Sequence, residues 1–110
     1  MFSIRVRKID IPEARPAVSV IVCAKNEAKN LRNNIPLLME QKYPEAQIIV
    51  VDDCSTDDTL TVLSELRARY PELYYTSIPA DSKYIHGKKL AVTVGIKAAK
   101  HEKIVFIDAD

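Results

Sequence analysis

Three polar segments that carry carboxylates each follow directly after an apolar run of the chain. They are Lys25-Asn26-Glu27, Asp52-Asp53-Cys54-Ser55-Thr56-Asp57 and Asp108-Ala109-Asp110. Carboxylates that lie close together repel one another and raise each other's pKa unless a cation lies among them. Because no histidine–cysteine ligand set is available, the expected cation is Mg²⁺ or Mn²⁺ rather than zinc. Mg²⁺ completes its shell with substrate phosphates, so the pattern predicts a nucleoside diphosphate held through a metal.

The elements that would bring these segments together are four short strands. The runs that predict them are Val18–Cys23, Ile48–Val51, Leu73–Ser77 and Lys103–Ile107. Apolar residues at helical spacing predict three helices between the strands: over residues 27–41, between residues 57 and 71, and over residues 87–100. The order β-α-β-α-β-α-β predicts an α/β fold with a parallel sheet and helices on both faces.

Two details of the helices can be predicted from their residues. Pro36 is expected to kink or split the first helix at Ile35. The second helix is expected to bury one face, which carries Leu60, Leu63, Leu66 and Tyr70. The usual strand order of such a Rossmann-like sheet is 3-2-1-4, which reverses the winding between the first strand and the fourth. Ligands bind beyond the carboxyl ends of the strands at that point, where the three polar segments lie.

Several of these residues also have an ordinary structural interpretation. Ser55, Thr56 or Asp57 could cap the following helix. Glu27 could be an acid of a helix's first turn. Lys88 and Lys89 follow Gly87 at a helix start, which suits a phosphate but also suits a solvated basic face. Gly95 lies within the third helix, where it costs about 1 kcal/mol relative to alanine, so close helix packing is its expected reason.

Composition excludes some classes of protein. The chain has 110 residues and a formal net charge of +1, which argues against a dedicated nucleic-acid binder. Cys23 and Cys54 form neither a metal-ligand spacing nor a disulfide framework, which fits a reducing compartment. No apolar run approaches the ~20 residues that span a bilayer. The dinucleotide-binding, P-loop and nucleophile-elbow glycine motifs are absent.

Taken in their order along the sequence, these segments resemble family-2 glycosyltransferases of the GT-A fold over residues 17–110. The opening strand with Asn26-Glu27, the second strand with its Asp-Asp-x-Ser-x-Asp turn, the Gly87-Lys88-Lys89 helix start and the terminal Asp-x-Asp motif are each similar to family features. The resemblance implies that residues 17–110 are the N-terminal, nucleotide-diphospho-sugar-binding half of such a domain. Residues 1–16 would be an N-terminal arm.

The resemblance implies roles for residues around the nucleotide. Asp53 would accept a hydrogen bond from the base, which is uracil in many relatives. Ala24 and Glu27 would line the base and ribose pocket. Lys88 would face the diphosphate, with Lys89 as the alternative.

For the cation, the resemblance implies Asp110 as a direct ligand and Asp108 as a contact to the ribose or the metal shell. The cation, Mg²⁺ or Mn²⁺, would act as a Lewis acid on the leaving diphosphate. The family's catalytic base would lie beyond Asp110, so no residue of this chain is expected to be catalytic. We therefore expect the isolated chain to bind its donor weakly and to transfer nothing.

The implied reaction is inverting hexosyl transfer from a nucleotide-diphospho-sugar, with a UDP-sugar as the expected donor, to the hydroxyl of a glycan or lipid. Cys23-Ala24-Lys25 stands where many relatives have Pro-x-Tyr, and this variant resembles a membrane-associated branch that makes cell-envelope polysaccharides. We expect a cytoplasmic protein and leave open a location at the inner face of the membrane through segments outside this chain. Two alternatives also stay open: a nucleotidyltransferase-like enzyme and a phospho-accepting receiver module.

Overall fold

The computed structural model describes residues 17–41, 45–79 and 88–108, with the side chains of Lys88 and Asp108 outside the description. The predicted arm, residues 1–16, lies outside the described residues, so the division into arm and domain stays a prediction.

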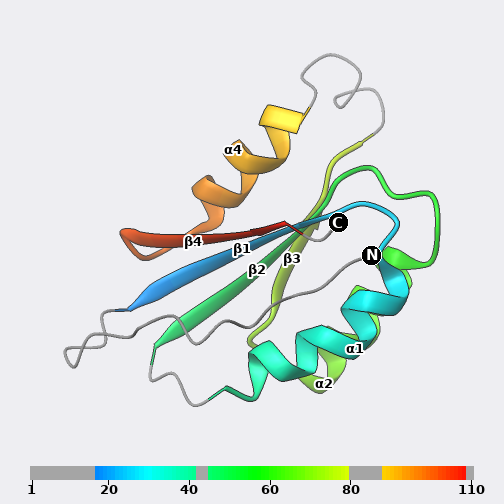
Figure 1. Ribbon diagram of the computed structural model, residues 1–110, viewed down its shortest axis with the longest axis horizontal. Coiled ribbons are helices and arrows are strands. Elements are labelled where there is room, and N and C mark those ends of the chain that lie inside the picture. The colour runs from blue at the N-terminus through cyan, green and yellow to red at the C-terminus, as the bar shows by residue number, and fades with distance from the viewer. Residues whose placement is uncertain (1–16, 42–44, 80–87, 109–110) are drawn as a thin grey trace.

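Seven elements alternate along the described chain (Figure 1). The strands are β1 (Val18–Ala24), β2 (Ala46–Asp52), β3 (Tyr74–Ser77) and β4 (Lys103–Asp108). The helices are α1 (Ala28–Met39), α2 (Thr59–Arg69) and α4 (Lys88–Ala98). Each predicted strand and helix is present, with bounds that differ from the prediction by a few residues.

The four strands form one parallel sheet in the order β3-β2-β1-β4, which confirms the predicted fold class and strand order. Register aligns the carboxyl ends of the strands: Ala24 pairs with Asp52 on one side, and Cys23 pairs with Asp108 on the other. The polar segments therefore leave the same edge of the sheet, on either side of β1. The reversal of winding falls between β1 and β4, as predicted.

Alternate residues of the strands enter two separate cores. α1 and α2 cover one face of the sheet and α4 covers the other (Figure 1). On the first face, Val20, Val22 and Val50 pack with residues of α1 and α2 such as Leu31 and Leu63. On the second face, the buried residues are Ile21, Ile49, Val51, Ile78 and Ala91. Strands buried on both faces explain the continuous apolar runs of the sequence.

Gly95 allows α4 to approach the sheet closely. A Cβ atom added at this position would lie 2.5 Å from Cγ2 of Ile21, and Ile21 is completely buried. The prediction that close packing explains this helical glycine is confirmed.

A split of α1 at Ile35, one of the two outcomes predicted for Pro36, is wrong, because the helix continues through Pro36 to Met39. A kink at this position stays a prediction. Proline cannot donate to the carbonyl group of Arg32, but Arg32 is exposed, so solvent can satisfy that group. In α2, Leu60 is 42% exposed instead of sharing the buried face.

The buried face of α2 contains Val62, Leu63 and Leu66 together with the buried Thr59 at the start of the helix. The helix is therefore rotated relative to the face that the leucine spacing predicts. The position of Thr59 follows from its polar contacts at the carboxyl edge of the sheet, described below.

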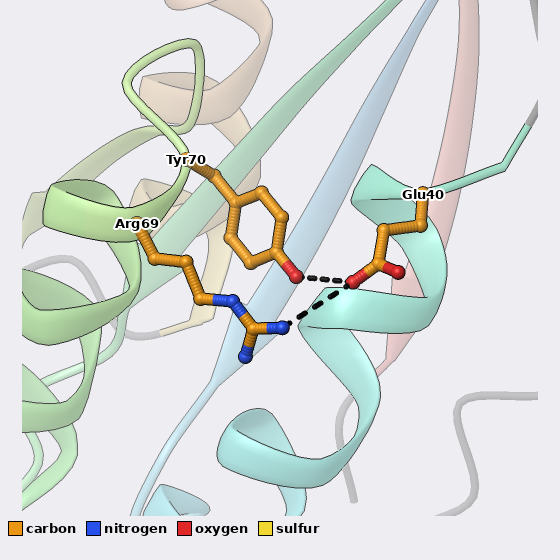
Figure 2. A network of polar contacts seen from close by, with 3 residues as sticks. All are labelled: Glu40, Arg69 and Tyr70. Carbon is orange, nitrogen blue, oxygen red and sulfur yellow. Dashed lines mark hydrogen bonds and ion pairs between the residues drawn. The ribbon is translucent and has the colours of Figure 1, made fainter.

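The last turns of α1 and α2 are joined at the opposite, amino-terminal edge of the sheet. Figure 2 shows the Tyr70 hydroxyl donating to the Glu40 carboxylate, with the Arg69 guanidinium 3.7 Å from the same oxygen. Arg69 also lies 5.1 Å from the centroid of the Tyr70 ring. The hydrogen bond to Glu40 raises the pKa of the Tyr70 hydroxyl above its ordinary value. These contacts are exposed, so they align the helix ends and add little stability.

Among the described helices, none combines the length and the apolar character that crossing a membrane requires.

Candidate functional site

The turns that follow β1 and β2 interlock at the carboxyl edge of the sheet. Asn26 and Cys54 have backbone φ angles of 55° and 59°, in the left-handed region that asparagine tolerates better than cysteine. The Asn26 N–H donates to Ser55 Oγ at 2.8 Å. Asn26 Oδ1 accepts from the Thr56 N–H at 2.7 Å, the Asp57 N–H at 3.2 Å and the Thr56 hydroxyl at 3.4 Å. The two turns therefore form one polar unit.

Asp57 joins the starts of α1 and α2. Its Oδ1 accepts from the Thr59 N–H at 2.9 Å and from the Thr59 hydroxyl, and its Oδ2 accepts from the Ala28 N–H at 3.4 Å. Thr59 Oγ1 in turn accepts from the Glu27 N–H at 3.2 Å. The first N–H groups of a helix have no partner inside the helix, so these contacts satisfy donors of both helices.

The predicted capping role is correct for Asp57 alone. The N-cap residue of α2 is Asp58, which makes no side-chain cap bond, while the side-chain hydroxyl groups of Ser55 and Thr56 are bonded to Asn26. Desolvation of the Asp57 carboxylate raises its pKa, but the hydrogen bonds that Thr59 and Ala28 donate outweigh it and hold the pKa below its ordinary value.

The adjacent acids at the end of β2, Asp52 and Asp53, have different structural roles. Asp52 is 1% exposed; its Oδ1 accepts from the Ser55 N–H at 3.2 Å and its carbonyl group accepts from the Ile78 N–H at 2.9 Å. Asp52 therefore shapes the turn. Asp53 is 8% exposed, and its N–H donates to the Ala24 carbonyl group at 2.7 Å. This bond places Asp53 directly beside the end of the central strand.

The residues that follow β1 form the other side of the same edge. Ala24 is 2% exposed. Glu27 is half-buried at the N-cap position of α1, before the first turn in which it was expected as a helix acid, and its carboxylate accepts from the Asn30 side chain at 2.7 Å. Lys25 is exposed between them. The structure thus brings Ala24, Glu27 and Asp53 together at one edge through their backbone contacts.

The remaining predicted site residues are described less completely. The backbone of Asp108 lies beside Cys23 of β1, which puts it two strands from Asp52, roughly 10 Å away at ordinary strand spacing. Asp110 lies outside the described residues. Lys88 begins α4 and Lys89 is exposed in its first turn.

In the ranges that the structure describes, no group of three or more histidine, cysteine, aspartate or glutamate side chains is arranged to hold a metal. Asp52 and Asp57 already accept hydrogen bonds from their own turn and helix starts. The predicted ligand pair, Asp108 and Asp110, stays a prediction, because the side chain of Asp108 and the whole of Asp110 lie outside the described residues.

Sequence reasoning missed the importance of Asn26 and Thr59. The motif predicts no structural role for Asn26 and the helical pattern predicts none for Thr59, although Asn26 Oδ1 accepts three of the bonds between the two turns. A signal was present in the sequence, because asparagine before a helix start is suited to a left-handed backbone and to accepting N–H groups. The partner turn, 29 to 31 residues away, could not be inferred from that signal.

Known proteins are similar to this chain in sequence and in architecture. The model of the family described as glycosyl transferase family 2 matches residues 19–110. Poly-beta-1,6-N-acetyl-D-glucosamine synthase from Staphylococcus epidermidis is 27% identical over 93 residues, which cover 84% of this chain and 21% of that protein.

Two solved structures are similar in fold as well as in sequence. The mannosyltransferase PcManGT from Pyrobaculum calidifontis, in complex with GDP-Man and Mn²⁺, has a TM-score of 0.73 and 33% identity over 87% of this chain and 28% of that chain. TarS 1-349 from Staphylococcus aureus, in complex with UDP, has a TM-score of 0.70 and 32% identity over 86% of this chain and 27% of that chain. The chain therefore spans between a fifth and a third of the length of these relatives.

Proposed function

The chain belongs to glycosyl transferase family 2 and has the GT-A fold, and from that premise we propose that its carboxyl edge binds a nucleotide-diphospho-sugar. The observation that carries the proposal is the placement of Asp53. Asp53 is buried, and its backbone N–H is bonded to the carbonyl group of Ala24, the last residue of β1. A carboxylate only accepts hydrogen bonds, so Asp53 suits the N–H of a nucleotide base. The structures of PcManGT with GDP-Man and of TarS with UDP support a nucleotide or nucleotide-sugar as the ligand.

The roles proposed for the other site residues rest on membership of the family. Ala24 and Glu27 would line the base and ribose pocket, and Lys88 or Lys89 at the start of α4 would face the diphosphate. Asp108 would contact the ribose or the metal shell, and Asp110 would ligate a divalent cation. Mn²⁺ in the PcManGT complex supports a cation of this kind, and Mg²⁺ has the same ligand chemistry.

The reaction of the whole protein is hexosyl transfer, with inversion, to a hydroxyl group of a glycan or lipid of the cell envelope. The cation supplies charge stabilisation to the leaving diphosphate when it is bound. The residues of this chain bind and orient the donor, while a carboxylate outside the chain deprotonates the acceptor. The location that goes with this function is the cytoplasm, with the inner face of the membrane as the alternative.

Calorimetric titration with UDP and with GDP, each with Mn²⁺ and with EDTA, tests this function. We expect one of the two nucleotides to bind in a Mn²⁺-dependent way. Asp53→Asn removes a charged acceptor, and hydrogen bonds to charged groups contribute about 1.5–3 kcal/mol. The Kd of that nucleotide should therefore rise by about 10- to 100-fold.

The matched control is Asp58→Asn, which removes the same charge from an exposed residue without a side-chain cap bond. It should leave the Kd within about threefold of the native value. Equal affinities of the Asp53→Asn variant and the native protein would overturn the proposed base contact. Absence of binding by the native protein to both nucleotides would overturn the proposed function.

A further inference from the structure

Three of the bonds between the β1–α1 turn and the β2–α2 turn converge on a single atom. Asn26 Oδ1 accepts three hydrogen bonds, from the N–H groups of Thr56 and Asp57 and from the Thr56 hydroxyl. These donors lie 30 and 31 residues along the chain. Removal of this one acceptor therefore breaks three bonds at once, and leaves the Asn26 N–H to Ser55 Oγ and Ala28 N–H to Asp57 Oδ2 bonds between the same segments.

The segment held in this way contains the proposed base contact. The 53–57 turn is attached at its start by the Asp53 N–H to Ala24 bond, and at its end by the bonds to Asn26. Glu27, next to Asn26, is attached to the same unit through Thr59. The distance between Asp53 and Glu27 is thus set by these hydrogen bonds, which form a brace between the two turns, and by the pairing of β1 with β2.

We propose that Asn26 is a positioning residue for donor binding, because it holds Asp53 and Glu27 at a fixed separation before the nucleotide arrives. This role rests on the proposed function. A site that is ordered in advance does not spend binding free energy on ordering its own turns. Asn26 makes its contribution through other residues and needs no contact with the donor.

Asparagine combines two properties that substitutions can separate. At φ 55° the backbone favours glycine, asparagine or aspartate. Asn26→Gly keeps the left-handed backbone and removes the acceptor. Asn26→Asp keeps the backbone preference and supplies an oxygen that can accept the same three bonds.

The opposite edge of the sheet provides a matched control. Gln47 Oε1 accepts from the Ser19 hydroxyl at 2.8 Å and the Lys100 N–H at 2.9 Å, and Gln47 Nε2 donates to the Ala98 carbonyl group at 3.1 Å. This brace also joins distant segments through three bonds of one side chain, but it lies at the amino-terminal ends of β1 and β2. Gln47→Ala should therefore destabilise the fold without changing the donor site.

The experiment uses the full-length protein that contains this chain, as the native form and as the Asn26→Gly, Asn26→Asp and Gln47→Ala variants. Three quantities are measured: the Kd of UDP and GDP with Mn²⁺, the urea midpoint of unfolding, and amide hydrogen exchange over residues 53–59. For Asn26→Gly we expect faster exchange in this segment and a nucleotide Kd raised by about tenfold, the equivalent of 1.4 kcal/mol. For Asn26→Asp we expect a Kd within about threefold of the native value.

Gln47→Ala should lower the urea midpoint by an amount similar to Asn26→Gly while exchange over residues 53–59 and the Kd stay native. A native nucleotide Kd for Asn26→Gly would overturn the positioning role. So would an equal loss of nucleotide affinity in Asn26→Gly and Gln47→Ala. An equal loss of nucleotide affinity in Asn26→Gly and Asn26→Asp would also overturn this role, because the missing acceptor oxygen would then not be the cause of the weaker binding. If the native protein binds neither nucleotide, the proposed function itself fails, which is a different result from native binding that survives Asn26→Gly.

Discussion

At residue scale, Gly95 sets two effects of similar size against each other. Alanine stabilises a helix interior by about 1 kcal/mol relative to glycine. At this position its Cβ would lie 2.5 Å from Ile21 Cγ2, and overpacking of a filled core costs about 1–3 kcal/mol. Ile21 is completely buried and branched at Cβ, so it cannot rotate away easily. The steric cost should exceed the gain in helix propensity.

We therefore expect Gly95→Ala to lower the free energy of unfolding by about 1 kcal/mol. Urea unfolding measures this change. Combining it with Ile21→Ala, which removes the clashing methyl group, should make the two effects non-additive, and Gly95→Ala should then stabilise the weakened background. A Gly95→Ala variant that is more stable than the native chain would show that α4 moves outward without cost.

At the scale of elements, the start of α2 makes the fold sensitive to acid. The hydrogen bonds from Thr59 and Ala28 hold the pKa of Asp57 below its ordinary value, which is about 3.9 in an unfolded chain. The unfolded state therefore takes up the proton more readily. The stabilisation is complete above the unfolded pKa and is lost as the pH falls through the lower pKa of the folded state.

The measurement is the free energy of unfolding between about pH 2 and 7 for the native chain and Asp57→Asn. The native chain should lose its advantage over the variant below about pH 4. Because Asp57 is exposed, the difference should be small and should shrink in high salt. A difference that is constant over the whole range would contradict the role of the ionised carboxylate.

The elements themselves could be predicted because each has a strong local signal. The apolar runs gave four strands in the right places, and the connection pattern gave their order. The rotation of α2 could not be predicted, since Leu60 has the right spacing but Thr59 is drawn inward by Asp57 and Glu27. The same holds for Asn26, whose partners belong to another turn. Motif spacing predicts which edge of the sheet carries the site, but contacts between turns that are distant in sequence determine the structural role of each residue at that edge.

At the scale of the whole molecule, the family match and the order of strands and acids along the chain distinguish this protein from the two alternatives, a receiver module and a nucleotidyltransferase-like enzyme. A receiver module keeps its acidic pair after the first strand, whereas Asp52 and Asp53 follow β2. The nucleotidyltransferase-like alternative lacks support, because the family match and the solved neighbours are glycosyltransferases. The chain nevertheless spans only 28% of PcManGT and 27% of TarS 1-349. We therefore expect donor binding and sugar transfer to be separable properties of the whole protein.

The isolated 110 residues should bind UDP or GDP with Mn²⁺ more weakly than the full-length protein and should transfer no sugar. The donor-side groups Ala24, Glu27 and Asp53 are present in the chain, whereas the proposed base lies outside it. Removing the general base costs about 10²–10⁴-fold in rate, and loss of acceptor positioning costs more. Calorimetry measures the first property, and release of labelled sugar onto a glycan acceptor measures the second. A transfer rate comparable to that of the full-length protein would show that a base lies within these residues, and Asp53→Asn in the isolated chain would then reveal whether donor binding at this edge supports it.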